Sequence, residues 1–269
     1  MKSFFKTLRK CWDIIKINTV NTWQEETAHF WNNWGSIVST TTYTIVSIIF
    51  VHILINKFKL IAGYNLNQLL FFNLLGQLAY FSANGFFKPS IDHLITSIKR
   101  GNLDFTLLKP VPSLFYISFR KIPLVSIFRD SIANILVYVF IIDWKSLNLQ
   151  PNIFLIALIM IILGIIIWHC FMFMLTFTIF WLGESKRVFL LNQSIADDRG
   201  TPYEGFPKNI RLFLTFIIPM TLNYSLPVSI ALEKSNPSWI FLSIILAIIF
   251  IFLKKWVWIK GLKAYTSAS

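Results

Sequence analysis

The chain has 269 residues, of which 55% are hydrophobic and only 14% are charged. A soluble domain carries nearer a quarter of charged residues, so this composition excludes an ordinary soluble enzyme and favours one all-α, polytopic membrane protein. The formal net charge of +13 would suggest a nucleic-acid partner in a soluble chain, but its placement, described below, gives it another role.

The first 33 residues predict an amphipathic helix that lies in the membrane interface. Phe4, Leu8, Trp12 and Ile15 recur at spacings of four, four and three, and most of the basic residues fall on the other faces. Such a helix buries its apolar side at the acyl boundary and directs its lysines toward anionic headgroups. We therefore expect membrane lipid to be a partner of this segment.

Six apolar segments are near the length of about 20 residues that a membrane span needs: 35–55, 66–87, 122–142, 153–182, 210–231 and 239–258. The fifth contains Pro219 and Pro227 on either side of Asn223, which a plain helix would not favour. A break at membrane depth is tolerated only where protein or water satisfies the freed backbone groups. We expect this span to kink or re-enter near the outer surface, where the three residues could form an outer gate.

The basic residues predict the orientation. Twenty-one of the 25 Lys and Arg residues fall in the N-terminal stretch, in the loops after the second and fourth spans with the flanking ends of the spans, and in the C-terminal stretch with the end of the sixth span; the remaining four are Lys57, Lys59, Lys145 and Lys234. Basic residues concentrate on the cytoplasmic side, so both termini are expected in the cytoplasm of a cell (inner or plasma) membrane protein. The charge then orients the chain and meets anionic lipid, and no nucleic acid is needed to explain it.

Polar residues inside the predicted spans allow two interpretations. The first span begins with many hydroxyl groups, and the second carries polar residues at spacings of four, three and four: Asn73, Gln77, Tyr80 and Asn84. They could line a translocation path or a dimer seam. Alternatively, they hydrogen-bond neighbouring helices, which contributes about 0.6 kcal/mol for each contact.

No catalytic, cofactor-binding or metal site is expected. His52 and the adjacent His169 and Cys170 lack the spacing of a ligand set, and a core histidine is the simpler interpretation of His169. Asp130 follows Arg129 in the third span and needs a partner, either Asn134 one turn on or a base from another helix. A membrane-embedded lipid-modifying enzyme that uses Asp130, His169 or the loop 199–204 is the alternative function.

The stretch 98–115 is basic, and Gly101 and Pro110 interrupt it. Leu103, Leu107 and Leu108 repeat at helical spacing between these breaks, and Asp104 falls in the first turn, where the helix dipole favours an acid. The pattern predicts a short amphipathic helix, 102–109, on a loop at the membrane surface. The alternative is an ordinary solvated loop between two spans.

Three stretches in order carry a family resemblance. They are Gly-x-Leu-Asp-x-x-Leu-Leu-x-Pro-x-x-x-Leu-Phe at 101–115, Pro-Tyr-Glu-Gly-Phe-Pro at 202–207, and the ending at 261–269. The first resembles a signature of one branch of the ABC type-2 permeases, the membrane subunits of ATP-binding-cassette exporters. The second resembles that family's second cytoplasmic loop, and the third resembles its C-terminal segment.

The resemblance implies a permease subunit that exports a substrate and has no ATPase site of its own; the chain also lacks a P-loop motif. A separate ABC ATPase subunit would bind the ATP, and a second permease chain, identical or homologous, would complete the channel. The N-terminal helix would either pack beside the ATPase or serve only as an anchor. The parts would be the interfacial helix 1–33, six spans within 34–259, and a cytoplasmic tail 260–269. The resemblance places ATPase coupling on Arg100, Gly101, Leu103, Asp104, Leu107, Leu108 and Pro110.

Overall fold

The computed structural model describes the chain except for residues 1, 29, 184–186, 189, 192–201 and 266–269. Its regular structure is helical, apart from one β-bridge between Ile61 and Tyr64. The helices in chain order are α1 Lys2–Ala28, α2 Phe30–Phe58, α3 Leu66–Lys99, α4 Leu103–Leu107, α5 Ser113–Ser118, α6 Leu124–Ile141, η1 Trp144–Leu147, α7 Pro151–Phe177, α8 Ile179–Leu182, η2 Tyr203–Gly205, α10 Lys208–Phe216, η3 Thr221–Ser225, α11 Leu226–Ala231 and α12 Trp239–Ala264.

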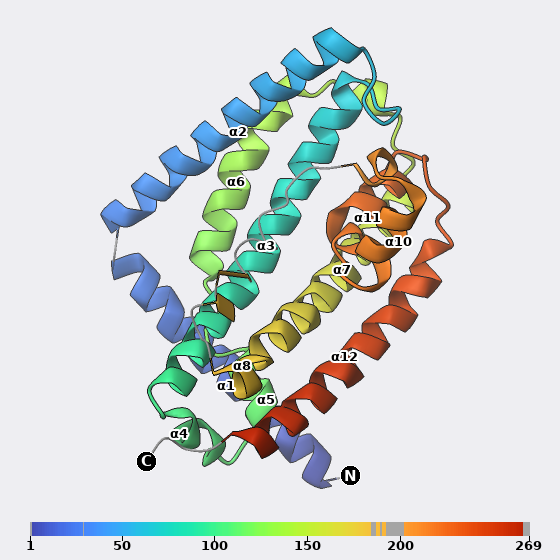
Figure 1. The fold of residues 1–269 in the computed structure, drawn as a ribbon. Helices are drawn as coiled ribbons and strands as arrows, with labels where there is room; N and C mark the ends of the chain where they lie inside the picture. Colours follow the sequence, from blue (N-terminus) through green and yellow to red (C-terminus); the bar gives the residue numbers. More distant parts are fainter. Residues whose placement is uncertain (1, 29, 184–186, 189, 192–201, 266–269) are drawn as a thin grey trace.

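The long helices form a bundle with two distinct ends (Figure 1). The α4 end contains α4, α5, α8 and the last turns of α12, and α1 lies there too. The η1 end contains the α2–α3 loop, η1, and the start of α12. One core cluster joins α7 and α12 to the second half of α3, and another joins α2 and α6 to its first half.

The all-helical membrane fold is confirmed, but six apolar spans are not. Among the described residues, four helices are long and apolar enough to cross a membrane, and a bent pair would make a fifth. The second predicted span lies within α3, whose amides, including Asn73 and Gln77, make it less apolar than the others. With 34 residues, α3 is about 51 Å long, whereas a hydrocarbon core is about 30 Å thick. Part of α3 must therefore project beyond the core.

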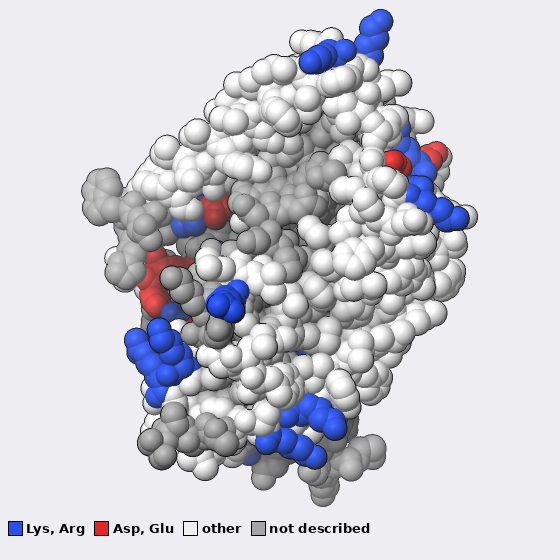
Figure 2. Space-filling view, viewed as in Figure 1, with Lys and Arg blue, Asp and Glu red and all other residues white. Residues whose placement is uncertain are grey.

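Large apolar side chains cover the outside of the bundle. Phe140 is 85% exposed, and Phe128, Ile53 and Phe241 are also exposed. Figure 2 shows a broad uncharged surface in the lower right of the view, below a charged cluster at the upper right edge, and Lys and Arg gather mostly toward the two ends. Exposing an apolar surface of this extent to water would be unfavourable, whereas contact with lipid is favourable.

The break predicted in the fifth span is present. Lys208–Phe216 and Thr221–Ala231 are bent by 89° relative to each other, and Pro219 lies in the four residues between them. The chain continues as a π-helical turn, η3, and Pro227 enters the first turn of α11, where its missing N–H costs nothing. Pro219, Asn223 and Pro227 are all buried, so this segment packs inside the protein.

The stretch 202–207 does not lie where the charge pattern placed it. The Tyr64 hydroxyl donates to Glu204 Oε2 at 2.8 Å, and Ser229 also donates to Glu204. Burial raises the pKa of Tyr64, so its hydroxyl keeps its proton and remains the donor. Glu204 is therefore at the η1 end, beside the loop that carries Lys59, and its assignment to the opposite side is corrected.

The error arose because loops were assigned by position along the sequence, whereas Glu204 and Tyr64 are 140 residues apart and meet only in the fold. The connecting residues 192–201, with Arg199, lie outside the described part. Transferring Lys208 and Arg211 to the other side changes the ratio of basic residues from 21 to 4 into 19 to 6. The basic residues therefore still predict that both termini are cytoplasmic.

α1 is a continuous helix whose described side chains form two unlike faces. Asn18 and Thr22 are buried against the protein, whereas Trp12 is 67% exposed and Trp23 is also exposed. The Asn18 amide donates to the Phe119 carbonyl at 3.0 Å. α1 thus binds the bundle through its polar face and turns its aromatic face outward, an arrangement suited to a membrane interface.

Gly164 on α7 allows the broken span to approach closely. A Cβ at this position would overlap the Leu222 carbonyl oxygen of η3. We expect Gly164→Ala to displace η3 and lower the free energy of unfolding by about 1–3 kcal/mol, the usual cost of overpacking. Thermal unfolding of the purified protein in detergent measures this. Gly35→Ala is the matched control, because a Cβ at Gly35 meets no atom within 4 Å; equal melting temperatures for the two variants would contradict the packing.

Candidate functional site

Gly101 makes the turn that joins α3 to α4. Its φ of +68° lies in the left-handed region, which favours glycine. The turn satisfies the last carbonyls of α3: Gly101 N–H donates to Ile98 at 3.1 Å, and Asn102 N–H donates to Ser97 at 2.8 Å. The sequence break thus marks a sharp, hydrogen-bonded corner, and the predicted short helix follows it as α4, Leu103–Leu107.

The two sides of α4 differ from the prediction. Leu103 is 0% exposed and belongs to the core that includes Leu94 and Ile117, so it is unavailable to a partner. Leu107 is half-buried and packs against the same core. The exposed apolar pair is Phe105 at 71% and Leu108 at 81%. Leu103, Leu107 and Leu108, which repeat at helical spacing, therefore do not form one outward face.

A helical repeat shows that a segment is amphipathic but not which side its own chain covers. Residues 105 and 108 have the same i, i+3 spacing as a helix face, so they could have been noticed as a second apolar stripe. α4 has only five residues, so the widths of its two apolar stripes do not show which of them is buried. The contacts with α3 and α5 decide it instead.

Polar groups flank the exposed pair. Lys109 Nζ donates to the Tyr116 hydroxyl at 2.6 Å and lies 4.1 Å from the centre of the same ring. Arg100 and Pro110 are exposed on either side of α4. Asp104 lies in the first turn, as expected, and no hydrogen bond or ion pair of its side chain is found within the described residues. These groups surround the apolar pair with charge.

α5 connects this segment to the far side of the bundle. It contacts both α3 and α4, and its Ser118 hydroxyl accepts a hydrogen bond from Lys254 of α12 at 2.7 Å. Lys254 Nζ also lies 2.8 Å from His169 Nε2 of α7 and 4.5 Å from the centre of the Phe173 ring. Lys254 and His169 are both buried. One ammonium group therefore ties α5, α7 and α12 together.

The sequence interpretation missed Lys254 and counted it with the cytoplasmic lysines. The available signal was its position inside the apolar run 239–258, where an ionisable residue is costly and calls for internal partners. His169 is confirmed as a core histidine. Its partner could not be found from spacing, because the two residues are 85 positions apart.

The polar residues of the first and second spans fall into two groups. Gln77 accepts from Thr44 at 3.1 Å and from Asn134, and its own amide donates to Asn73 at 2.7 Å and Tyr138 at 3.3 Å. This network is buried and joins α2, α3 and α6. It favours the hydrogen-bonding interpretation for Asn73 and Gln77.

The remaining polar residues line a cleft of about 480 Å³ between the same helices, nearer the α4 end. Tyr80, Asn84 and Lys88 of α3 face Ser39, Thr40 and Tyr43 of α2 across it, and Asp130 of α6 also lines it. A polar cleft is consistent with the translocation interpretation for Tyr80 and Asn84. The hydrogen-bonding interpretation thus accounts for Asn73 and Gln77, whereas Tyr80 and Asn84 line a polar cleft.

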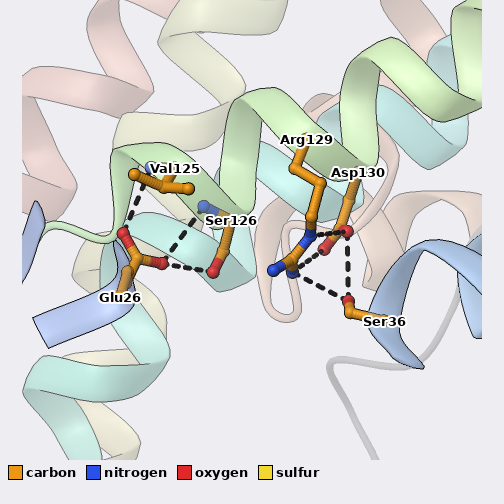
Figure 3. Close-up of polar contacts among 6 residues, drawn as sticks. All are labelled: Glu26, Ser36, Val125, Ser126, Arg129 and Asp130. Atoms are coloured by element: carbon orange, nitrogen blue, oxygen red, sulfur yellow. Dashed lines mark hydrogen bonds and ion pairs between the residues drawn. The ribbon is translucent and has the colours of Figure 1, made fainter. Parts of the chain in front are cut away.

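Glu26 of α1 caps the start of α6 (Figure 3). Its carboxylate accepts the Val125 and Ser126 N–H groups, each at 3.1 Å, and the Ser126 hydroxyl. Helix N-termini favour negative charge, so α1 is fastened to the bundle by an electrostatically suitable contact. Beside it, Lys121 forms an ion pair with Glu25 at 2.9 Å.

The partner of Asp130 differs from both candidates. Arg129 Nε donates to Asp130 Oδ1 at 2.8 Å, and Ser36 of α2 bridges the pair (Figure 3). Neighbours on a helix do not normally face each other. The long arginine side chain curves back, however, and both groups point toward Ser36. Asp130 therefore takes its charged partner from the preceding residue of its own helix.

The residues of the enzyme alternative do not converge. Asp130 contacts α2, His169 contacts α12, and Glu204 contacts Tyr64 and Ser229 at the η1 end. A catalytic site needs titratable groups that meet around one substrate. Within the described residues, no group of three or more His, Cys, Asp or Glu residues could hold a metal ion.

The apolar bundle with charged ends defines a polytopic integral membrane protein. Residues 41–269 match the family model described as ABC-2 family transporter protein, so the chain belongs to this family of membrane domains of ABC transporters. The predicted family is thereby confirmed. No curated protein and no solved structure gives a significant match. Members of the family are transporters and generally carry no ATPase site of their own.

The Lys254 contacts predict unequal costs for two substitutions. His169→Leu removes a partner and leaves the buried ammonium group less well satisfied, which should lower the free energy of unfolding by about 1–3 kcal/mol. Lys254→Met replaces the charge by an apolar side chain of similar length and should cost less, or stabilise the fold. Thermal unfolding in detergent, with the double variant as a control, measures both. A larger loss for Lys254→Met than for His169→Leu would contradict this account.

Proposed function

We propose that this chain is the permease subunit of an ABC exporter and that a separate ATPase subunit docks on α4. The observation that carries the proposal is the exposed pair Phe105 and Leu108 on a short helix whose other side is fixed in the core. An apolar pair ringed by charged side chains is typical of a protein contact. ATP would bind the partner ATPase subunit and not this chain.

The position of α4 supports docking of a soluble subunit. If residues 66–87 of α3 fill the hydrocarbon core, the following 12 residues carry α4 about 18 Å beyond it. With the orientation favoured by the basic residues, that end is cytoplasmic, where ATP is available. The exposed pair would then stand clear of the lipid.

The connections of α4 support coupling to the membrane helices. The Gly101 corner joins it directly to α3, and α5 follows it after a short loop. Ser118 of α5 is bonded to Lys254 of α12, which also meets His169 of α7. A displacement of α4 by the ATPase would therefore reach three long helices at once.

Two permease chains, identical or homologous, would form the complete channel with two ATPases. Within each chain, the polar cleft between α2 and α3 would contribute to the substrate path, and the broken span to the outer gate. Asn223 Oδ1 is buried without a hydrogen-bond partner among the described residues. That unsatisfied oxygen, between Pro219 and Pro227, suits a segment that changes partners during transport.

The docking proposal predicts the effect of removing the exposed pair. Phe105→Ala with Leu108→Ala should leave membrane insertion intact, lower the affinity for the ATPase subunit and abolish ATP-driven transport. Burying each side chain contributes about 1.5–3 kcal/mol, so the loss of affinity should exceed tenfold. Co-purification of the ATPase from a mild detergent, followed by titration of the separated subunits, measures it.

Phe58→Ala with Leu60→Ala is the matched control, because it removes a Phe and a Leu that are also exposed, at 58% and 57%, from the η1 end. We expect this pair to retain the ATPase. If the α4 variant binds and transports like the unsubstituted chain, α4 is not the docking element. ATP hydrolysis by the purified chain alone would reject the permease function itself.

The corrected topology predicts which residues an impermeant thiol reagent reaches. In a variant with Cys11 and Cys170 replaced, single cysteines at Asn148 and Lys208 should be labelled from outside intact cells, and one at Asn102 should not. Asn148 and Lys208 lie at the η1 end or in the helix that follows Glu204, whereas Asn102 adjoins α4. Outside labelling at Asn102 would reverse the orientation, and exclusive inside labelling at Lys208 would contradict the placement of α10.

A further inference from the structure

A cationic cavity of about 370 Å³ lies beside α4, between the end of α3 and α5. Its lining includes Arg100, Lys109, Arg120 and His93, and no Asp or Glu is among its lining residues. The nearest acid along α3 is Asp92. Burial raises the pKa of Asp92, and the neighbouring charge that acts on this pKa is Lys88 of the same helix, not a cation of the cavity. The positive charge of the cavity is therefore not neutralised by a lining carboxylate.

Two of these cations lie over the same aromatic ring, and one of them has an N–H group without a hydrogen-bond acceptor. Lys109 and Arg120 both lie over the Tyr116 ring, at 4.1 and 5.3 Å from its centre. Arg120 Nη1 donates to Asn18 Oδ1 at 3.3 Å, but its Nε is buried and without a hydrogen-bond partner in the described part of the chain. Burial, and then the charges of Arg120, Lys121 and Lys109, lower the pKa of His93. The enclosed Arg120 Nε, a rare and costly unpaired donor, thus leaves the positive charge beside the cavity incompletely satisfied by the chain itself.

The position of the cavity indicates where such a ligand comes from. Headgroups occupy about 5–8 Å on each side of the hydrocarbon core, whereas the end of α3 extends about 18 Å beyond it. Phe105, which is exposed, also lines the cavity. A partner that covers Phe105 therefore also covers the cavity. A free inorganic anion would make no favourable contact with the apolar rim.

We infer that the cavity receives a carboxylate side chain, Asp or Glu, from the ATPase subunit. The carboxylate pairs with Arg100 and Lys109, and the partner's apolar surface packs on Phe105 and Leu108 beside it. Charge-assisted hydrogen bonds of this kind are short and directional, so they would fix the register of docking that an apolar pair alone leaves free. The inference rests on the proposed function and adds the chemistry of the partner.

The first test neutralises the cavity without emptying it. Arg100→Gln with Lys109→Gln should lower the affinity for the co-purified ATPase subunit at least tenfold at low salt and flatten its dependence on salt. The matched control is Lys99→Gln with Lys263→Gln, which removes two exposed charges from the same end, neither lining the cavity. The control pair should stay within about twofold of the unsubstituted chain, because solvent screens such charges. Equal melting temperatures establish that both variants fold.

The second test exchanges the charges. Arg100→Glu with Lys109→Glu should abolish binding, and Lys substitution of one acidic surface residue of the ATPase should restore it. If no such substitution restores binding, or the Gln variant binds normally while Phe105→Ala with Leu108→Ala does not, the docking proposal stands and this inference is wrong. If the unsubstituted chain binds no ATPase, the proposed function itself fails. If the Gln variant instead loses affinity only for phosphatidylglycerol vesicles, the cavity binds a lipid phosphate and the inference is overturned.

Discussion

The arrangement of this protein depends on one constraint: polar groups held in an apolar surrounding must be satisfied by the protein itself. Three sets of buried or half-buried polar contacts follow from it. The Gln77 and Asn134 amides pair between α3 and α6, Asp130 is held by Arg129 and Ser36, and Lys254 is shared by Ser118 and His169. Apolar packing between helices in lipid gains little, because lipid tails are equally apolar. The polar contacts are therefore what select which helices lie side by side.

Composition and periodicity predicted the elements because both are local properties. Spans, the break at Pro219 and the corner at Gly101 are each determined by residues within one or two turns. The side of α4 that faces the core, the partners of Lys254 and the place of Glu204 were not predictable in this way. They are contacts between residues 85 to 140 positions apart, or choices between two apolar stripes, and a single sequence contains no local signal for either.

The α3 helix illustrates how the same residue types acquire different roles along one element. Its first half carries amides that neighbouring helices satisfy, and its middle carries Tyr80, Asn84 and Lys88, which face a cleft. Its last turns leave the apolar region and end at a glycine corner that directs α4 across the end of the bundle. The two interpretations of its polar face were posed for the whole helix, but its polar residues have different surroundings along its length. The structure separates them by depth.

Positively charged side chains have two opposite kinds of surroundings at the same end of the bundle. Lys254 is buried, but Ser118, His169 and the Phe173 ring surround it, so its position is fixed and it joins three helices. Arg100, Lys109 and Arg120 surround a cavity whose lining offers them no carboxylate, and one guanidinium nitrogen there has no acceptor. A charge that is satisfied internally stabilises one arrangement of the helices. A charge that is not satisfied raises the free energy of the isolated subunit and lowers it again when an anionic partner arrives. Because α5 belongs to both groups, through Ser118 and through Tyr116, occupancy of the cavity and the packing of α7 and α12 are physically linked by six residues of one short helix.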